Sequence, residues 1–223
     1  MMRFVALAIG VVLAGAQAAP AGPWLREKGK GFAAISGNVT QEKDTSGSAY
    51  FEYGLRENIT LGADLFYGID RTLQQSGSGI IFLRFPISEP DATHKWAWHV
   101  GIGARSQNTV ITPAVEAGLS WGRGIKLGER YGWAVIDSSL NIPGSDLETR
   151  IKLDGTIGLG FTDHIKGMAQ VFMTHQGGEI FAKFAPSVLL VPGKSPYTIQ
   201  IGVEIPVQGG GDTEFKLGLW RDF

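Results

Sequence analysis

Residues 148–161 (ETRIKLDGTIGLGF) decide the fold class of this chain, because their side chains alternate strictly in polarity. One face of the stretch carries Ile151, Leu153, Gly155, Ile157, Leu159 and Phe161, and the other carries Arg150, Lys152, Asp154 and Thr156. Such alternation predicts a β-strand, because successive side chains in a strand point to opposite faces. An apolar face backed by a face with charges of both signs is typical of a strand between lipid and a polar interior.

The same pattern recurs along the chain from about Gly31 onward, and turn residues bound each stretch. The expected strands cover residues 31–40, 47–55, 59–69, 79–87, 95–106, 110–122, 132–142, 147–161, 165–174, 180–191, 196–206 and 213–223. We therefore predict an all-β fold, a transmembrane antiparallel up-and-down β-barrel of about twelve strands, with about ten to fourteen compatible with the pattern. An even number returns the C-terminus to the side of the membrane where the first strand starts.

The order of the strands divides their connections between the two sides of the membrane. The expected periplasmic links are residues 56–58, 88–93, 123–131, 162–164 and 192–196. The expected outer loops are residues 41–46, 70–77, 107–109, 143–146, 176–179 and 208–211. Outer loops this short predict neither a large inward-folded plug nor an adhesive surface. The link 123–131 is long for the periplasmic side, where turns are normally tight.

Composition excludes several classes of protein. The 223 residues have a formal net charge of −1 and lack a basic cluster, so a nucleic-acid partner is not expected. The absence of Cys excludes disulfides and thiolate metal sites. Aromatic residues near the strand ends predict the two interfacial girdles of a membrane barrel. They are Phe32, Phe51, Tyr53, Trp96, Trp98, Trp121, Trp133, Tyr197, Trp220 and Phe223.

The N-terminus has the pattern of an export signal. Arg3 precedes an apolar stretch over residues 4–13, and Ala16-Gln17-Ala18 forms an A-x-A cleavage site. We predict a signal peptide over residues 1–18, cleaved near Ala18, a short periplasmic segment over residues 19–30 and a barrel over residues 31–223. The expected location is the bacterial outer membrane.

The C-terminus adds a second export feature. Phe215, Leu217 and Leu219 alternate up to the terminal Phe223, which resembles the signal read by the outer-membrane assembly machinery of Gram-negative bacteria. Arg221 departs from that pattern, because an apolar or aromatic residue usually stands there. The expected partners are this machinery and outer-membrane lipid.

Two segments resemble the bacterial outer-membrane family of the MetA pathway of phenol degradation. Residues 24–32 (WLREKGKGF) are similar to its lead into the first strand, and residues 53–62 (YGLRENITLG) to its first periplasmic hairpin. The resemblance implies a barrel and a periplasmic hairpin, and it implies no particular substrate.

Alternation assigns charged residues of both signs to the barrel interior, where they must be paired or hydrated. The acidic candidates are Glu52, Asp64, Glu116, Asp137, Asp154, Glu204 and Glu214. The basic candidates are Arg84, Arg105, Arg150, Lys152, Lys183 and Lys216, with His99 nearby. These charges either cross-link the wall and close the bore or line a narrow aqueous path. Barrels of about eight strands are filled by side chains and those of about sixteen hold a channel, so this size is compatible with both.

The predicted function is a narrow pore for passive uptake of small solutes. The alternatives are a plugged structural barrel, a soluble periplasmic β-sandwich and an outer-membrane lipid hydrolase. A barrel hydrolase needs a Ser activated by a His on the outer wall, and none of His94, His99, His164 and His175 has a Ser two residues later. We therefore expect no enzymatic activity, no catalytic residues, no cofactor and no metal site.

Overall fold

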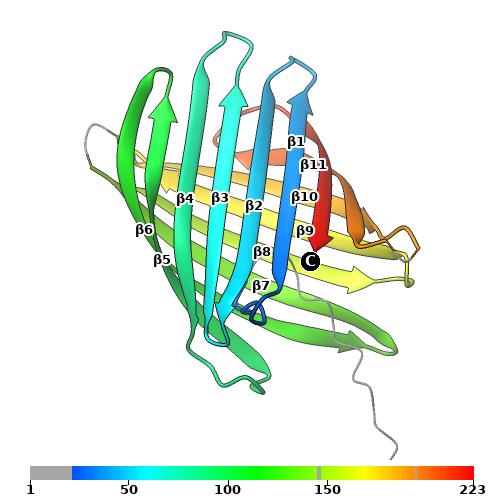
Figure 1. Ribbon diagram of the computed structural model, residues 1–223. Coiled ribbons are helices and arrows are strands. Elements are labelled where there is room, and N and C mark those ends of the chain that lie inside the picture. The colour runs from blue at the N-terminus through cyan, green and yellow to red at the C-terminus, as the bar shows by residue number, and fades with distance from the viewer. Residues whose placement is uncertain (1–21, 145–146, 194) are drawn as a thin grey trace, which may run out of the picture.

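The chain forms twelve β-strands in the computed structural model, which describes residues 22–144, 147–193 and 195–223 (Figure 1). They are β1 (Gly31–Thr40), β2 (Thr45–Arg56), β3 (Ile59–Ile69), β4 (Gln75–Pro86), β5 (His94–Gln107), β6 (Val110–Leu127), β7 (Arg130–Pro143), β8 (Arg150–Gly160), β9 (Ile165–Gln176), β10 (Glu179–Leu190), β11 (Tyr197–Gln208) and β12 (Glu214–Asp222). The predicted signal peptide, residues 1–18, lies outside the described residues. No helix in the described ranges has the length and apolar character needed to cross a membrane.

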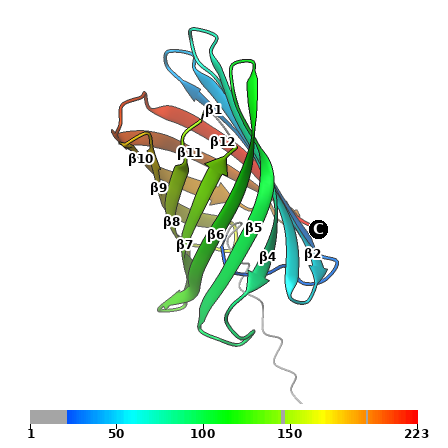
Figure 2. The ribbon, with the colours of Figure 1, turned by 90° about the vertical axis from the view of Figure 1, so that its left-hand side faces the viewer.

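The strands close into an antiparallel up-and-down barrel. Each strand pairs with its neighbours in sequence, and β1 closes the ring by pairing with β12. Gly31 and Phe223 seal this junction with reciprocal backbone hydrogen bonds of 2.7 and 3.0 Å. The predicted barrel of about twelve strands is confirmed, and the β-sandwich alternative is wrong because the sheet has no free edge. Figures 1 and 2 show β1–β4 as one wall, with β8–β11 crossing behind it.

The two faces of the wall are the reverse of those in a soluble protein. On β5, Trp98 and Ile102 are 41% and 70% exposed, whereas His99 and Arg105 are 8% and 4% exposed. The same contrast holds around the barrel, where large apolar side chains cover the outer face and polar ones fill the inner face. This arrangement suits a hydrocarbon solvent outside and a polar interior.

The predicted long link over residues 123–131 is wrong. β6 continues to Leu127 and β7 begins at Arg130, so only two residues form the turn. Gly128 has a φ of 62°, which a residue without Cβ adopts at little cost. Charged side chains made the segment read as a loop, but Lys126 pairs with Tyr131 in the ladder and lies over its ring.

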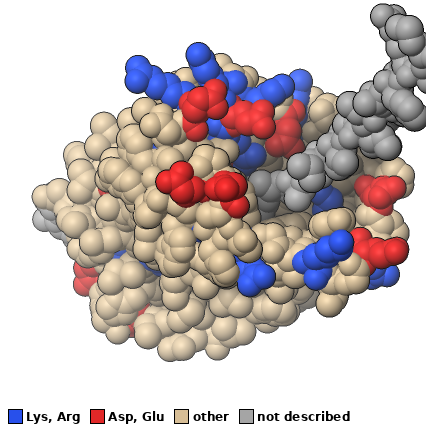
Figure 3. Space-filling view, turned by 90° about the horizontal axis from the view of Figure 1, so that it is seen from below, with Lys and Arg blue, Asp and Glu red and all other residues tan. Residues whose placement is uncertain are grey.

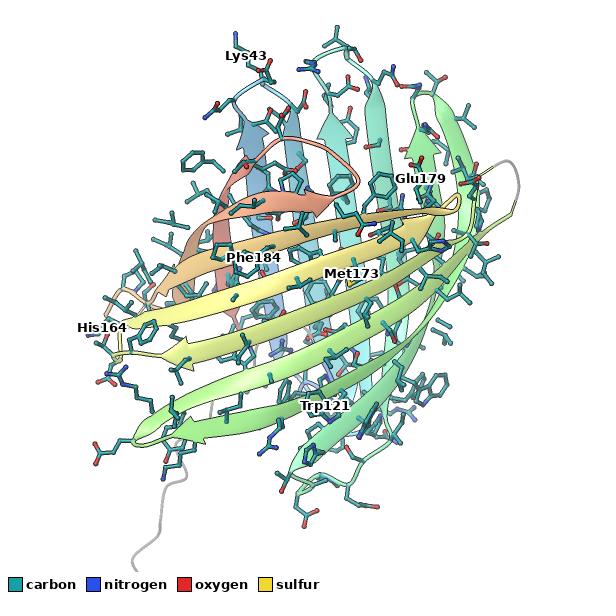
Figure 4. All side chains as sticks on the ribbon, turned by 180° about the vertical axis from the view of Figure 1, so that it is seen from behind. Lys43, Trp121, His164, Met173, Glu179 and Phe184 are labelled. Carbon is teal, nitrogen blue, oxygen red and sulfur yellow. The ribbon has the colours of Figure 1, made fainter. Side chains whose placement is uncertain are left out.

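The barrel has two distinct ends. We call the end with Gly31 and Phe223 the terminal end; it also holds the turns after β2, β4, β6, β8 and β10. The opposite end, the loop end, holds the remaining turns. Figure 4 labels Lys43 and Glu179 at the loop end and His164 in a turn at the terminal end. The loop-end connections are short, as predicted.

The segment before β1, residues 22–30, is bound to the terminal end. Gly29 donates its N–H to the carbonyl of Gly54, and Gly54 donates to the carbonyl of Lys30, both at 2.9 Å. A side chain at Gly54 would overlap the backbone of Glu27. Glycine at this position of β2 therefore allows the close approach that holds the segment.

Candidate functional site: the charged barrel interior

The most buried charged cluster surrounds Glu52 on β2. The Glu52 side chain is 1% exposed, and it forms ion pairs with Arg84 and, at 2.7 Å, with Arg26 of the N-terminal segment. Tyr50 donates its hydroxyl to the same carboxylate at 2.5 Å. One carboxylate thus accepts charge-assisted hydrogen bonds from two guanidinium groups, which are stronger than bonds between neutral groups.

Gly62 makes room for this cluster. It pairs with Glu52 on one side and with Phe82 on the other, and a Cβ at this position would overlap the Phe82 ring. The Arg84 guanidinium lies over that ring, 5.2 Å from its centroid. The glycine that ends the quoted hairpin motif therefore has a packing role in the barrel interior.

His99 lies in the interior beside a carboxylate. Its Nε2 is 3.5 Å from Oε1 of Glu116, and Asn141 donates to the other carboxylate oxygen at 3.2 Å. Gly118 pairs with His99, and a Cβ there would overlap the imidazole. His99 is therefore not on the outer wall, where a lipid hydrolase would need its base. Among the described residues, no three His, Asp or Glu side chains are grouped as metal ligands.

The middle of the bore is predominantly acidic. Asp64, Asp137 and Asp154 are half-buried, like Lys152. Lys152 interacts electrostatically with Asp64 and Asp154, and Asp137 interacts with Arg84. Together with Glu52 and Glu116, these carboxylates outnumber the basic groups around them.

A third cluster lies nearer the loop end, on β10, β11 and β12. Lys183 forms ion pairs with Glu204, at 3.3 Å, and with Glu214. Lys216 lies 2.9 Å from Glu204. Asn38 on β1 donates to Glu214 at 2.8 Å, which extends the cluster across the junction that closes the barrel. In this cluster each ammonium group has a carboxylate partner.

The last two predicted interior residues, Arg105 and Arg150, meet across the interior from β5 and β8. Arg105 donates to the Gln176 side-chain oxygen at 3.0 Å and to the Glu148 carbonyl at 2.7 Å. Arg150 donates to the same Gln176 oxygen at 2.9 Å. The predicted interior charges thus fall into separate clusters along the barrel.

Sequence reasoning missed an apolar cluster at the terminal end. Trp133, Val135, Met168 and Leu189 are buried together, and Trp24 and Trp220 pack against them. A Cβ at Gly122 on β6 would also contact the Trp24 ring. The prediction that Phe32, Trp133 and Trp220 belong to an interfacial girdle is wrong, because all three lie on the inner face, where Phe32 and Trp133 are buried. The alternation of the strand could have shown this, because Trp133 and Asp137 are four residues apart and therefore point to the same, inner face.

The expected assembly signal forms a continuous outer face. Phe215, Leu217, Leu219 and Phe223 are all exposed on the outside of β12 and at its end. Arg221, the departure from the pattern, lies over the ring of Tyr197 at 5.3 Å from its centroid. The aliphatic part and planar head of Arg can cover such a ring, which makes this charge compatible with an apolar face. Recognition of these residues by assembly machinery stays a prediction.

Outside the spanning strands, the turn after β3 is ordered by Asp70. Its Oδ1 accepts hydrogen bonds from the Thr72 hydroxyl at 2.6 Å, the Thr72 N–H at 2.8 Å and the Gln74 N–H at 3.0 Å. These bonds, led by the hydroxyl, hold the pKa of Asp70 below its usual value. The carboxylate therefore stays ionised, and the turn stays bonded, throughout the neutral range.

Comparison with known proteins identifies the fold and no closer relationship. No family model and no curated protein sequence matches the chain. The KdgM porin matches with a TM-score of 0.61 and 7% identity over 86% of this chain and 99% of the porin. The structure of the KdgM porin in complex with disordered oligogalacturonate matches with a TM-score of 0.58, at the same identity and coverage. The COG4313 outer membrane channel from Pseudomonas putida F1 has a TM-score of 0.59 and 12% identity over 90% and 97% of the two chains. LpxR from Salmonella typhimurium has a TM-score of 0.55 and 8% identity over 85% and 99%. The chain therefore has the fold of outer-membrane barrels.

Proposed function

We propose that this chain is an outer-membrane channel for passive uptake of small hydrophilic solutes. The observation that carries the proposal is the inverted wall, with apolar side chains outside and ionised ones inside. A polar interior of this kind is costly unless it is hydrated or fully paired. The shared fold with the KdgM porin and the COG4313 channel supports the same function.

The proposed location and partners follow from the outer face. The apolar belt would contact outer-membrane lipid, after export by the signal peptide and its cleavage near Ala18. Phe215, Leu217, Leu219 and Phe223 would be read by the assembly machinery. Membership of the MetA-pathway family is proposed on residues 24–32 and 53–62 alone.

A plugged structural barrel is the second candidate function. The observation that favours it is the packing of Trp24 into the terminal end, where the bore would have to open. An enzymatic function has less support, because His99 faces Glu116 in the interior. The channel and the plugged barrel differ in whether current crosses the bilayer.

Conductance in a planar bilayer tests the proposal. We expect the refolded mature chain to produce small, uniform current steps in potassium chloride, because paired side chains narrow the bore. Reversal potentials in a salt gradient should show only a weak preference for K⁺ over Cl⁻, since the middle of the bore is acidic but the charges of the whole lumen nearly balance. Bilayers in which inserted barrel produces no current would instead establish the plugged barrel. Insertion is checked by heat-modifiable migration of the protein recovered from the bilayer lipid.

A further inference from the structure

Among the described residues, Arg105 and Arg150 form no ion pair with a carboxylate, in contrast to Arg84, Lys183 and Lys216. Arg84 contacts Glu52, and Lys183 and Lys216 contact Glu204. Among the described residues, by contrast, Arg105 and Arg150 form hydrogen bonds only to the neutral oxygens of Gln176 and Glu148, the latter a backbone carbonyl. Two positive groups therefore converge on one amide oxygen.

This pairing is unfavourable unless something neutralises it. Arg105 is 4% exposed, so water compensates its charge poorly, and the neighbouring Arg150 repels it. Glu116 attracts Arg150, but its carboxylate lies against His99 and forms no ion pair with either arginine among the described residues. The bonds to Gln176 fix the directions of both guanidinium groups without supplying negative charge. Each guanidinium has more N–H donors than these bonds use. The arrangement is an oriented pair of cationic donors.

We propose that Arg105 and Arg150 bind the carboxylate group of an organic anion at the loop end of the barrel. This inference rests on the proposed channel function and gives that channel a substrate class. A carboxylate matches the planar fork of a guanidinium better than a spherical anion does.

A neighbouring group extends the site toward hydroxylated anions. Asn141 pairs with Arg150 in the ladder between β7 and β8, is 4% exposed, and has no hydrogen-bond partner for its Oδ1. A buried acceptor without a partner is costly, and a hydroxyl group on a bound solute would satisfy it. Further along the bore, the acidic middle with Asp64 and Asp154 disfavours a second anion site.

Equilibrium binding to the refolded mature chain in detergent tests the site without requiring current. Isothermal titration compares D-glucuronate with D-glucose, which has the same ring and no carboxylate. We expect saturable binding of glucuronate and none of glucose. In the Arg105→Gln/Arg150→Gln variant, the affinity for glucuronate should fall by at least about tenfold, since two charge-assisted contacts are lost.

Matched variants separate the contribution of the bidentate guanidinium geometry from that of the positive charge. Arg105→Lys/Arg150→Lys keeps the charge but loses bidentate geometry, so its affinity should lie between those of the wild type and the Gln variant. Arg71→Gln removes an exposed loop-end arginine and should leave the affinity unchanged. If the double Gln variant fails to fold, as judged by heat-modifiable migration, Arg150→Gln alone serves the same comparison.

Two results would overturn the site: no saturable binding of glucuronate to the wild type, or equal affinity in the folded Gln variant. The fate of the channel is decided separately by conductance. A silent barrel that binds glucuronate would leave the site standing and end the channel proposal. A conducting barrel that does not bind glucuronate would support the channel proposal and overturn the binding site.

Discussion

Removing residues 22–28 from the mature chain should raise its single-channel conductance several-fold. These residues touch opposite parts of the inner wall at the terminal end. Trp24 packs against the apolar cluster that includes Trp133 of β7, whereas Arg26 binds Glu52 of β2. A segment that contacts both walls crosses the bore, so the current should be limited there.

The variant Trp24→Ala tests the apolar part of this barrier alone. It removes the ring that fills the terminal end and keeps the Arg26 contacts, so its conductance should lie between those of the wild type and the truncated chain. Lys28→Ala is the matched control, because Lys28 is exposed in the same segment and its bridge to Gly54 uses the backbone. Equal conductance in all four proteins would show that the segment does not limit the current.

The position of residues 22–28 at the terminal end also determines which side chains a solute meets along the bore. Figure 3, seen from below and hence toward the terminal end, shows charges of both signs around the rim. Inside the rim lies the apolar cluster around Trp133, followed by the acidic middle of the bore. A hydrated solute would therefore meet its highest barrier at the apolar cluster, because its buried apolar side chains do not compensate for lost water.

Strand positions could be predicted from the sequence because alternation is a local property. The expected strands 31–40 and 59–69 match β1 and β3 to the residue. The turn at Gly128 was missed because Arg123 and Lys126 break the apolar pattern near the membrane boundary, where charge no longer distinguishes a strand from a loop.

The clusters of the interior could be predicted only in part. Alternation assigns Arg105 and Arg150 to the inner face, but their meeting at Gln176 depends on the curvature of the wall between β5 and β9. The apolar cluster is completed by Trp24, which lies outside every strand, so alternation cannot assign its side chain to a face. Contacts across a bore are set by barrel geometry, which no local pattern encodes.

Substitution of Glu52 by Gln should destabilise the barrel by about 3–5 kcal/mol, because it leaves buried cations without their carboxylate. Arg84 loses its ion pair, and Arg26 loses the 2.7 Å contact that ties the N-terminal segment to β2. Equilibrium unfolding in urea, with the protein refolded into lipid vesicles, measures the change. The exposed pair of Glu42 and Arg71 provides the control, and Glu42→Gln should cost less than about 1 kcal/mol.

A double substitution separates the cost of an unpaired charge from the value of the pair itself. In Glu52→Leu/Arg84→Leu no buried charge remains from that pair, so much of the stability lost in Glu52→Gln should return. Recovery of stability would show that the fold does not need the ion pair, since an apolar replacement stabilises it about as well. The pair would then serve the polar bore and not the stability of the barrel. A double variant as unstable as Glu52→Gln would instead assign the cluster to structure, with Arg26 as the essential partner of Glu52.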